Sequence, residues 1–329
     1  MIDVTAVGEL LIDFTPAGKS TRGHALYEQN PGGAPANVLA FLSRLGHKTA
    51  FIGKVGCDLF GESLASILRE AGVDCRALLK TDVCHTTLAF VHLDEQGDRS
   101  FTFYRNPGAD LLLEPDDLPD DLIDQARFFH FGSVTMTDEP ARSATKAAVR
   151  MARRYGCLVS YDPNLRLMLW HSETEARNQI LSVMDQVDLL KISDDELLFL
   201  TGKTDLNQGA NWFFERFPLS VVLITEGPRG AFAATRRVSS HHPAFDVKTV
   251  DTTGAGDAFT GAFIDRLLSR KSDSMEDLSQ EELIQYLAFA NAAGSLTTTQ
   301  KGAIPAMPDR EEIERCMNEL PTLKITEHL

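Results

Sequence analysis

Short apolar runs alternate with segments of helical periodicity along most of the chain. Apolar residues recur at helical spacing from residue 36 to residue 45, and Gly46 then ends the pattern. Such patterns predict strands near residues 3–8, 49–55, 128–131, 158–161, 187–192 and 220–225, and helices near residues 36–45, 64–71, 141–155 and 283–297. We expect residues 10–14 to continue the first strand. Strands that alternate with helices predict an α/β fold around a mostly parallel sheet.

Two β-rich runs interrupt this alternation. Residues 86–93 and 99–105 flank the polar stretch 94–98, which is typical of a β-hairpin. In the second run Phe103 and Arg105 share one face, because side chains alternate along a strand. The chain therefore predicts a single α/β domain over residues 1–329, with strands inserted at about 15–31 and 84–106. A hairpin that only extends the edge of the main sheet is the alternative.

Composition limits the class of protein. The 329 residues are 43% hydrophobic, which is enough for a large core. A net charge of −15 and the lack of a basic run make nucleic acids and anionic membranes poor candidates as partners. The five cysteines are scattered and odd in number, which indicates reduced thiols and a cytoplasmic protein.

Gly254 and Gly256 mark the segment that is the strongest candidate for an active site. They flank Ala255 between an apolar segment and a helical pattern, which predicts a tight turn at a helix N-terminus. Backbone N–H groups at such a turn lack helical partners and, with the helix dipole, bind anions such as phosphate. Asp257 would repel that anion unless it is a general base that takes a proton from a substrate hydroxyl. An aspartate favoured in the first turn by the dipole is the alternative.

Two common nucleotide-binding motifs do not fit this chain. The dinucleotide fingerprint fails because Phe259 stands where its third glycine is required. A P-loop that ended at Gly18-Lys19-Ser20 would need its first glycine at Asp13. The predicted phosphate site is therefore of another type.

The stretch from Asp251 to Phe259 resembles the C-terminal signature of the ribokinase-like, or PfkB, carbohydrate kinase family. Residues 32–37 read G-G-A-P-A-N and resemble the family's N-terminal G-G-x-x-x-N signature. The resemblance runs from about Val4 to about Arg310. It implies a three-layer α/β/α fold with a small β-strand lid. It also implies an ATP-dependent sugar kinase that uses Asp257 as base. A non-catalytic sugar or nucleotide sensor on the same fold is the rival hypothesis.

The resemblance also implies the residues of a sugar site. These are Asp13, Gly33, Asn37, Phe103, Arg105 and Arg166. The segment D-P-N-L-R at residues 162–166 resembles bacterial fructokinases, so we expect D-fructose as the acceptor; 2-keto-3-deoxygluconate and aminoimidazole riboside stay open. A helix-facing Asn37 without a ligand and a surface salt bridge at Arg166 are the alternatives for those two residues.

Nucleotide and ion sites are implied in the same way. The N–H groups of Gly254, Ala255 and Gly256 would stabilise the transferring phosphoryl group. Residues expected to contact the nucleotide are Ser193, Thr225, Gly227, Gly230 and Asn291. Glu196 would influence Mg²⁺ through water, although Ser193 and Glu196 also fit a capping box, and the turn at 225–230 also fits a plain hairpin. Asp251, Thr253 and Gly302 match a monovalent-cation stretch, which suggests K⁺. A homodimer through the lid is expected as well.

Overall fold

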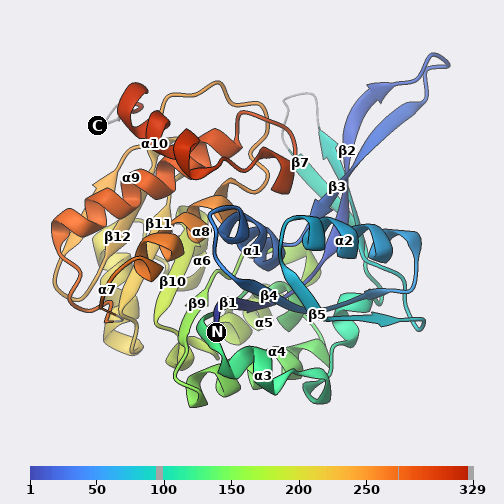
Figure 1. The fold of residues 1–329 in the computed structure, drawn as a ribbon, viewed down its shortest axis with the longest axis horizontal. Coiled ribbons are helices and arrows are strands. Elements are labelled where there is room, and N and C mark those ends of the chain that lie inside the picture. Colours follow the sequence, from blue (N-terminus) through green and yellow to red (C-terminus); the bar gives the residue numbers. More distant parts are fainter. Residues whose placement is uncertain (94–98, 273, 325–329) are drawn as a thin grey trace.

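The computed structural model describes residues 1–93, 99–272 and 274–324, and Figure 1 shows their arrangement. Among these residues, nine strands form a central sheet. In spatial order they are β13 (Ser239–His242), β12 (Ala231–Ala234), β11 (Val221–Thr225), β10 (Leu189–Ser193), β9 (Leu158–Tyr161), β8 (Ala126–Phe131), β1 (Ile2–Val7), β4 (Thr49–Gly56) and β5 (Asp74–Thr81). Every pairing from β11 to β5 is parallel, and β12 and β13 pair antiparallel at one edge. The predicted mostly parallel sheet is confirmed.

Helices cover both faces of this sheet, because its strands are apolar on both sides. Neighbouring residues such as Phe128 and Phe129 contribute to opposite cores. One face carries α1 (Ala34–Arg44), α2 (Leu59–Glu70), α8 (Ala255–Leu268), α9 (Gln280–Thr297) and α10 (Arg310–Glu319). The other carries α3 (Asp120–Asp124), α4 (Ala141–Arg154), α5 (Glu173–Leu181), α6 (Asp194–Thr201) and α7 (Leu206–Arg216). The result is the three-layer α/β/α architecture that the family resemblance implies.

A second, smaller sheet stands apart from the first (Figure 1). Its strand order is β3 (Ala25–Gly32), β2 (Leu11–Lys19), β6 (Leu88–Leu93) and β7 (Arg99–Tyr104). The antiparallel pair β6–β7 confirms the predicted hairpin, although the turn at residues 94–98 lies outside the described residues. We call this four-stranded sheet the lid.

The expectation that residues 10–14 continue the first strand is wrong. Strand β1 ends at Val7, and β2 begins at Leu11 in the lid. The reason is packing at the end of β1. A side chain at Gly8 would collide with the ring of Pro35 in the first turn of α1. Because α1 begins directly against the end of β1, the chain turns aside at that point and enters the lid.

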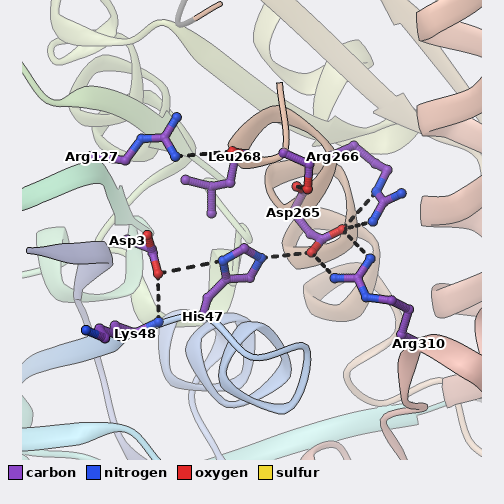
Figure 2. Close-up of polar contacts among 9 residues, drawn as sticks. Asp3, His47, Lys48, Arg127, Asp265, Arg266, Leu268 and Arg310 are labelled. Atoms are coloured by element: carbon purple, nitrogen blue, oxygen red, sulfur yellow. Dashed lines mark hydrogen bonds and ion pairs between the residues drawn. The ribbon is translucent and has the colours of Figure 1, made fainter. Parts of the chain in front are cut away.

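The C-terminal half of α8 is held by a buried carboxylate, Asp265, whose side chain is fully buried. Its oxygens accept hydrogen bonds from His47 Nε2 at 2.8 Å and Arg310 Nη2 at 2.6 Å, and Arg266 of the same helix also contacts it (Figure 2). His47 lies 3.7 Å from Asp3 at the start of β1. These contacts tie α8 to α10 and to the sheet.

No helix of the described ranges is both long and apolar enough to cross a membrane.

Candidate active site

A cavity of about 400 Å³ lies where α1 and α8 begin, under one face of the lid. The lid strands contribute Asp13, Asn30, Val91 and Phe103 to its wall. The remaining wall includes Glu9, Gly33, Asn37, Asn164, Arg166, Lys191, Asp251, Thr253, Gly254, Gly256, Asp257 and Gly302. Ligands of parallel α/β sheets bind at the carboxyl ends of the strands, and the loops after β1 and β9 open here. Most of the predicted sugar residues therefore line one cavity.

The glycine turn is built as the sequence predicts. Gly254 is the N-cap of α8 and has a φ of 78°, a conformation that favours glycine. A Cβ atom there would also lie 2.7 Å from the Cβ of Ala303. Of the three N–H groups expected to bind the phosphoryl group, those of Gly254 and Gly256 find no acceptor within the described part of the chain, whereas that of Ala255 donates to the carbonyl of Thr252 at 3.3 Å. The N–H group of Asp257 also finds no acceptor among the described residues. The turn can therefore bind an anion through its backbone.

Asn37 and Asp257 meet beside this turn. Asn37 Nδ2 donates a hydrogen bond of 2.8 Å to Asp257 Oδ2, which brings the two signatures together. Burial raises the pKa of Asp257 to about 6, and the hydrogen bond from Asn37 opposes that shift. A carboxylate with this pKa is ionised at neutral pH and is basic enough to accept a proton from a hydroxyl.

Asp13 lies across the cavity on β2. Burial raises its pKa to about 6 as well, against the influence of Arg166, whose charge lowers it. Arg166 follows β9 and lines the same cavity. The cavity wall therefore carries two carboxylates, Asp13 and Asp257, and the positive charge of Arg166 lowers the pKa of both. That polar set can bind several hydroxyl groups.

The structure does not bring Arg105 into this cavity. Its side chain is only 3% exposed, and its Nε and Nη2 atoms donate to Asp110 Oδ2 at 2.8 and 2.6 Å. Its other bonds reach Thr137 Oγ1 and the carbonyl of Val134. Arg105 thus ties the end of β7 to neighbouring loops. Asp110 neutralises the charge of its guanidinium. The expected contact between Arg105 and a sugar has no support in this geometry.

Ser193 and Glu196 lie outside the walls of the cavity, and they form the capping box that the sequence left as an alternative. Ser193 Oγ accepts from the N–H of Glu196 at 3.1 Å, and Glu196 Oε2 accepts from the N–H of Ser193 at 2.8 Å. Glu196 Oε1 accepts from the N–H of Leu165 at 2.6 Å. Both carboxylate oxygens are therefore engaged by the backbone, and Glu196 positions the segment that carries Arg166.

Lys191 is a functional candidate that the sequence analysis missed, and its partner is Asp162, the first residue of the D-P-N-L-R segment. Lys191 Nζ lies 2.9 Å from Asp162 Oδ2, and both side chains are buried. Lys191 also lines the cavity. The available signal was a lysine between the apolar residues Leu190 and Ile192 in a strand that the pattern predicts to be buried. A charged residue in a buried parallel strand requires a partner or a ligand.

A second cavity of about 270 Å³ adjoins the first and shares Thr252 and Gly256 with it. Its wall includes Thr225, Gly227, Gly230, Ala255, Phe259 and Asn291, so four of the five expected nucleotide residues meet here and Ser193 does not. The turn at residues 225–230 joins the antiparallel strands β11 and β12, so it is a hairpin turn that also forms a cavity wall. Asn291 Nδ2 donates to the carbonyl of His242 at 2.7 Å. The apolar wall around Phe259 suits a planar base.

Asp251, Thr253 and Gly302 are close together. Asp251 Oδ1 accepts from the N–H and the hydroxyl of Thr253, at 2.9 and 2.7 Å, and Oδ2 accepts from the N–H of Gly302 at 3.1 Å. This carboxylate joins the loop before α8 to the loop after α9. Within the residues that can be described, no three His, Cys, Asp or Glu side chains cluster as metal ligands.

Comparisons with known proteins agree with this geometry. The model of the pfkB family of carbohydrate kinases matches residues 1–310. Fructokinase-1 of Zea mays is 46% identical over 312 residues, which cover 94% of this chain and 96% of the maize protein. The structure of a fructokinase from Xylella fastidiosa with bound ATP superposes with a TM-score of 0.87 at 32% identity, and the match covers 97% of this chain and 99% of that one.

A fructokinase double mutant from Vibrio cholerae O395, solved with fructose, ADP and a potassium ion, gives a TM-score of 0.86 at 34% identity. That match covers 96% of this chain and 98% of the other. The resemblance seen in the two signatures is confirmed over nearly the whole length. The chain belongs to the pfkB family of carbohydrate kinases.

Proposed function

We propose that this protein is an ATP-dependent fructokinase, which transfers the γ-phosphoryl group of ATP to a primary hydroxyl of D-fructose. The observation that carries the proposal is the placement of Asp257. It lies between the N–H groups at the start of α8 and the polar wall of the larger cavity. Its partner Asn37 comes from the other signature. The maize relative and the two bacterial structures supply the choice of fructose within the family.

The reaction follows from this arrangement. The sugar hydroxyl gives its proton to the Asp257 carboxylate while its oxygen bonds to the γ-phosphorus. The bond from that phosphorus to the bridging oxygen breaks, and its electron pair leaves with ADP. The N–H groups of Gly256 and Asp257 stabilise charge on the transferring group. Mg²⁺, carried by the nucleotide phosphates, would neutralise part of their charge.

A neutral sugar fits the cavity better than an acid sugar. Arg105 is paired with Asp110, so among the described residues Arg166 is the arginine that lines the cavity. Asp13 and Asp257 would repel a substrate carboxylate. Phe103 offers an aromatic surface to the ring, and Asp13 with Asn37 can bind adjacent hydroxyls. These features favour fructose over 2-keto-3-deoxygluconate.

The test compares kcat/KM for fructose, 2-keto-3-deoxygluconate, ribose and aminoimidazole riboside under one set of conditions. We expect fructose to exceed each of the others. If the acid sugar or the riboside exceeds fructose by more than about tenfold, which corresponds to roughly 1.4 kcal/mol of transition-state preference, then fructose is the wrong acceptor.

Activation by K⁺ is part of the proposal. The loops that Asp251 joins lie beside the N–H groups of the α8 turn, so a cation held there would order that turn. Replacement of K⁺ by tetramethylammonium at equal ionic strength should lower kcat. An unchanged kcat would reject this part alone.

We also propose that two copies associate through the outer face of the lid. Phe14 and Phe90 stack there at 4.8 Å, and Tyr27 and Tyr104 extend the aromatic surface while 41% and 64% exposed. An exposed aromatic face is typical of a surface that a partner covers. Light scattering should give a dimer, and Tyr104→Glu should shift it to the monomer. A monomeric wild-type protein at 50 μM, a concentration chosen for the test, would contradict the proposal.

A further inference from the structure

Lys191 places a buried ammonium group in the wall of the larger cavity. The residue lies on β10, and its side chain is 9% exposed. A lysine ammonium has three N–H donors. Asp162 accepts from one of them at 2.9 Å, and no second acceptor for Nζ exists in the part of the chain that is described. The other donors are therefore available to a ligand in the cavity.

The ammonium lies directly beside the anion-binding turn of α8. A Cβ atom at Gly256 would be 3.2 Å from Lys191 Nζ and 3.9 Å from its Cε. The absence of a side chain at Gly256 thus leaves room for the ammonium and for a phosphate that approaches the backbone. Lys191 adds a full positive charge beside the N–H groups of Gly256 and Asp257, which have no acceptor among the described residues.

The group is positively charged at neutral pH. Burial lowers the pKa of Lys191, but the charges of Asp162, Glu196 and Asp257 outweigh burial and raise the pKa above its usual value. The cavity is otherwise rich in carboxylates, including Asp13 and Asp257. The γ-phosphoryl group of a bound triphosphate is negatively charged during its transfer, and a positive charge beside it stabilises that group.

We propose that Lys191 donates hydrogen bonds to the γ-phosphoryl oxygens during transfer and is a catalytic residue of the reaction proposed above. In that step Asp257 takes the proton of the sugar hydroxyl, the new sugar–phosphorus bond forms, and ADP leaves with the electron pair. Lys191 keeps its own protons throughout. A different role would be to neutralise Asp162 in the core, without contact to the substrate.

Two variants separate the two roles: Asp162→Asn and the double variant Asp162→Asn with Lys191→Met. If Lys191 acts on the phosphoryl group, the double variant should have a kcat roughly 10²–10³-fold below that of Asp162→Asn, with the KM for fructose nearly unchanged. If Lys191 only neutralises Asp162, the two should agree within about threefold. That agreement would overturn the proposal. Asp162→Asn is the matched control, because it removes the charge that Lys191 would otherwise balance.

A binding measurement covers the case in which turnover of the variants is too slow to detect. The affinity for ADP with aluminium fluoride and fructose should fall about 100-fold from Asp162→Asn to the double variant. The affinity for ADP alone should stay within about threefold. An equal affinity of both proteins for the fluoride complex would overturn the role of Lys191. A wild-type protein that phosphorylates no sugar would instead refute the proposed function, so the two failures are distinguishable.

Discussion

Asn37 donates a hydrogen bond to the carboxylate of Asp257 across 220 residues of sequence. The contact joins the first turns of α1 and α8, which each carry one of the two glycine-containing signatures. It orients the carboxylate beside the N–H groups of Gly256 and Asp257, which find no acceptor among the described residues. The proposed base and the proposed anion site therefore lie at one point, where two helices begin side by side.

The first prediction concerns the base itself. Asp257→Asn should keep the fold, because the side chain volume is nearly unchanged, and should lower kcat by roughly 10²–10⁴-fold, because no group remains to accept the proton. Steady-state kinetics with fructose and ATP measure the effect. Asp195→Asn is a matched control, since Asp195 is an exposed aspartate in the first turn of α6. A kcat within about tenfold of wild type would remove Asp257 from the mechanism.

The second prediction is an acidic limb in the pH profile. Burial raises the pKa of Asp257 to about 6, so the carboxylate becomes protonated and unable to accept a proton as the pH falls through 6. The kcat/KM for fructose should be level above about pH 7 and should fall below pH 6. Asp13, whose pKa burial also raises to about 6, should steepen the limb if it binds the sugar as a carboxylate. A limb centred near pH 4, the usual carboxyl range, would contradict this account.

The third prediction uses Asn37 to shift that limb. Its hydrogen bond stabilises the ionised form of Asp257 and so lowers the pKa of that group. Asn37→Ala should therefore move the acidic limb of kcat/KM to higher pH, in addition to any loss of sugar affinity. The measurement is the same pH profile, taken on wild type and variant. An unshifted limb with a raised KM would leave Asn37 as a sugar ligand only.

The fourth prediction concerns Asp265, which holds the C-terminal half of α8. Asp265→Asn leaves the guanidinium groups of Arg266 and Arg310 without their buried counter-charge (Figure 2). We expect the free energy of unfolding at pH 7 to fall by about 3 kcal/mol, measured by urea denaturation.

The pH dependence of that loss provides its control. The partners of Asp265 hold its pKa well below the usual range, even though burial opposes them. The carboxylate therefore contributes stability above the unfolded-state pKa of about 3.9, and the contribution disappears as the pH falls through the folded-state value. The difference between wild type and variant should be constant from pH 8 to 5 and should shrink below pH 4. A difference that grows with acid would rule out this role for Asp265.

Local patterns in the sequence determined the architecture. Alternation of apolar runs with helical periodicity predicted the parallel sheet, and the polar stretch between two β-rich runs predicted the hairpin of the lid. Gly254 and Gly256 could be placed at a helix N-terminus because turns of this kind depend on residues that are neighbours in sequence. The same is true of the capping box of Ser193 and Glu196.

The tertiary structure decided which charged groups face the substrate. Strand alternation predicts Arg105 on the same face as Phe103, which lines the cavity, yet Asp110 and Thr137 engage its guanidinium. Lys191 lies in a buried strand, as the apolar pattern predicts, but only the packing of α8 on the sheet places its ammonium beside Gly256. The physical reason is that a buried charge takes whichever partner the fold brings within hydrogen-bond distance. That distance depends on how strands and helices pack, and spacing along the chain does not encode it.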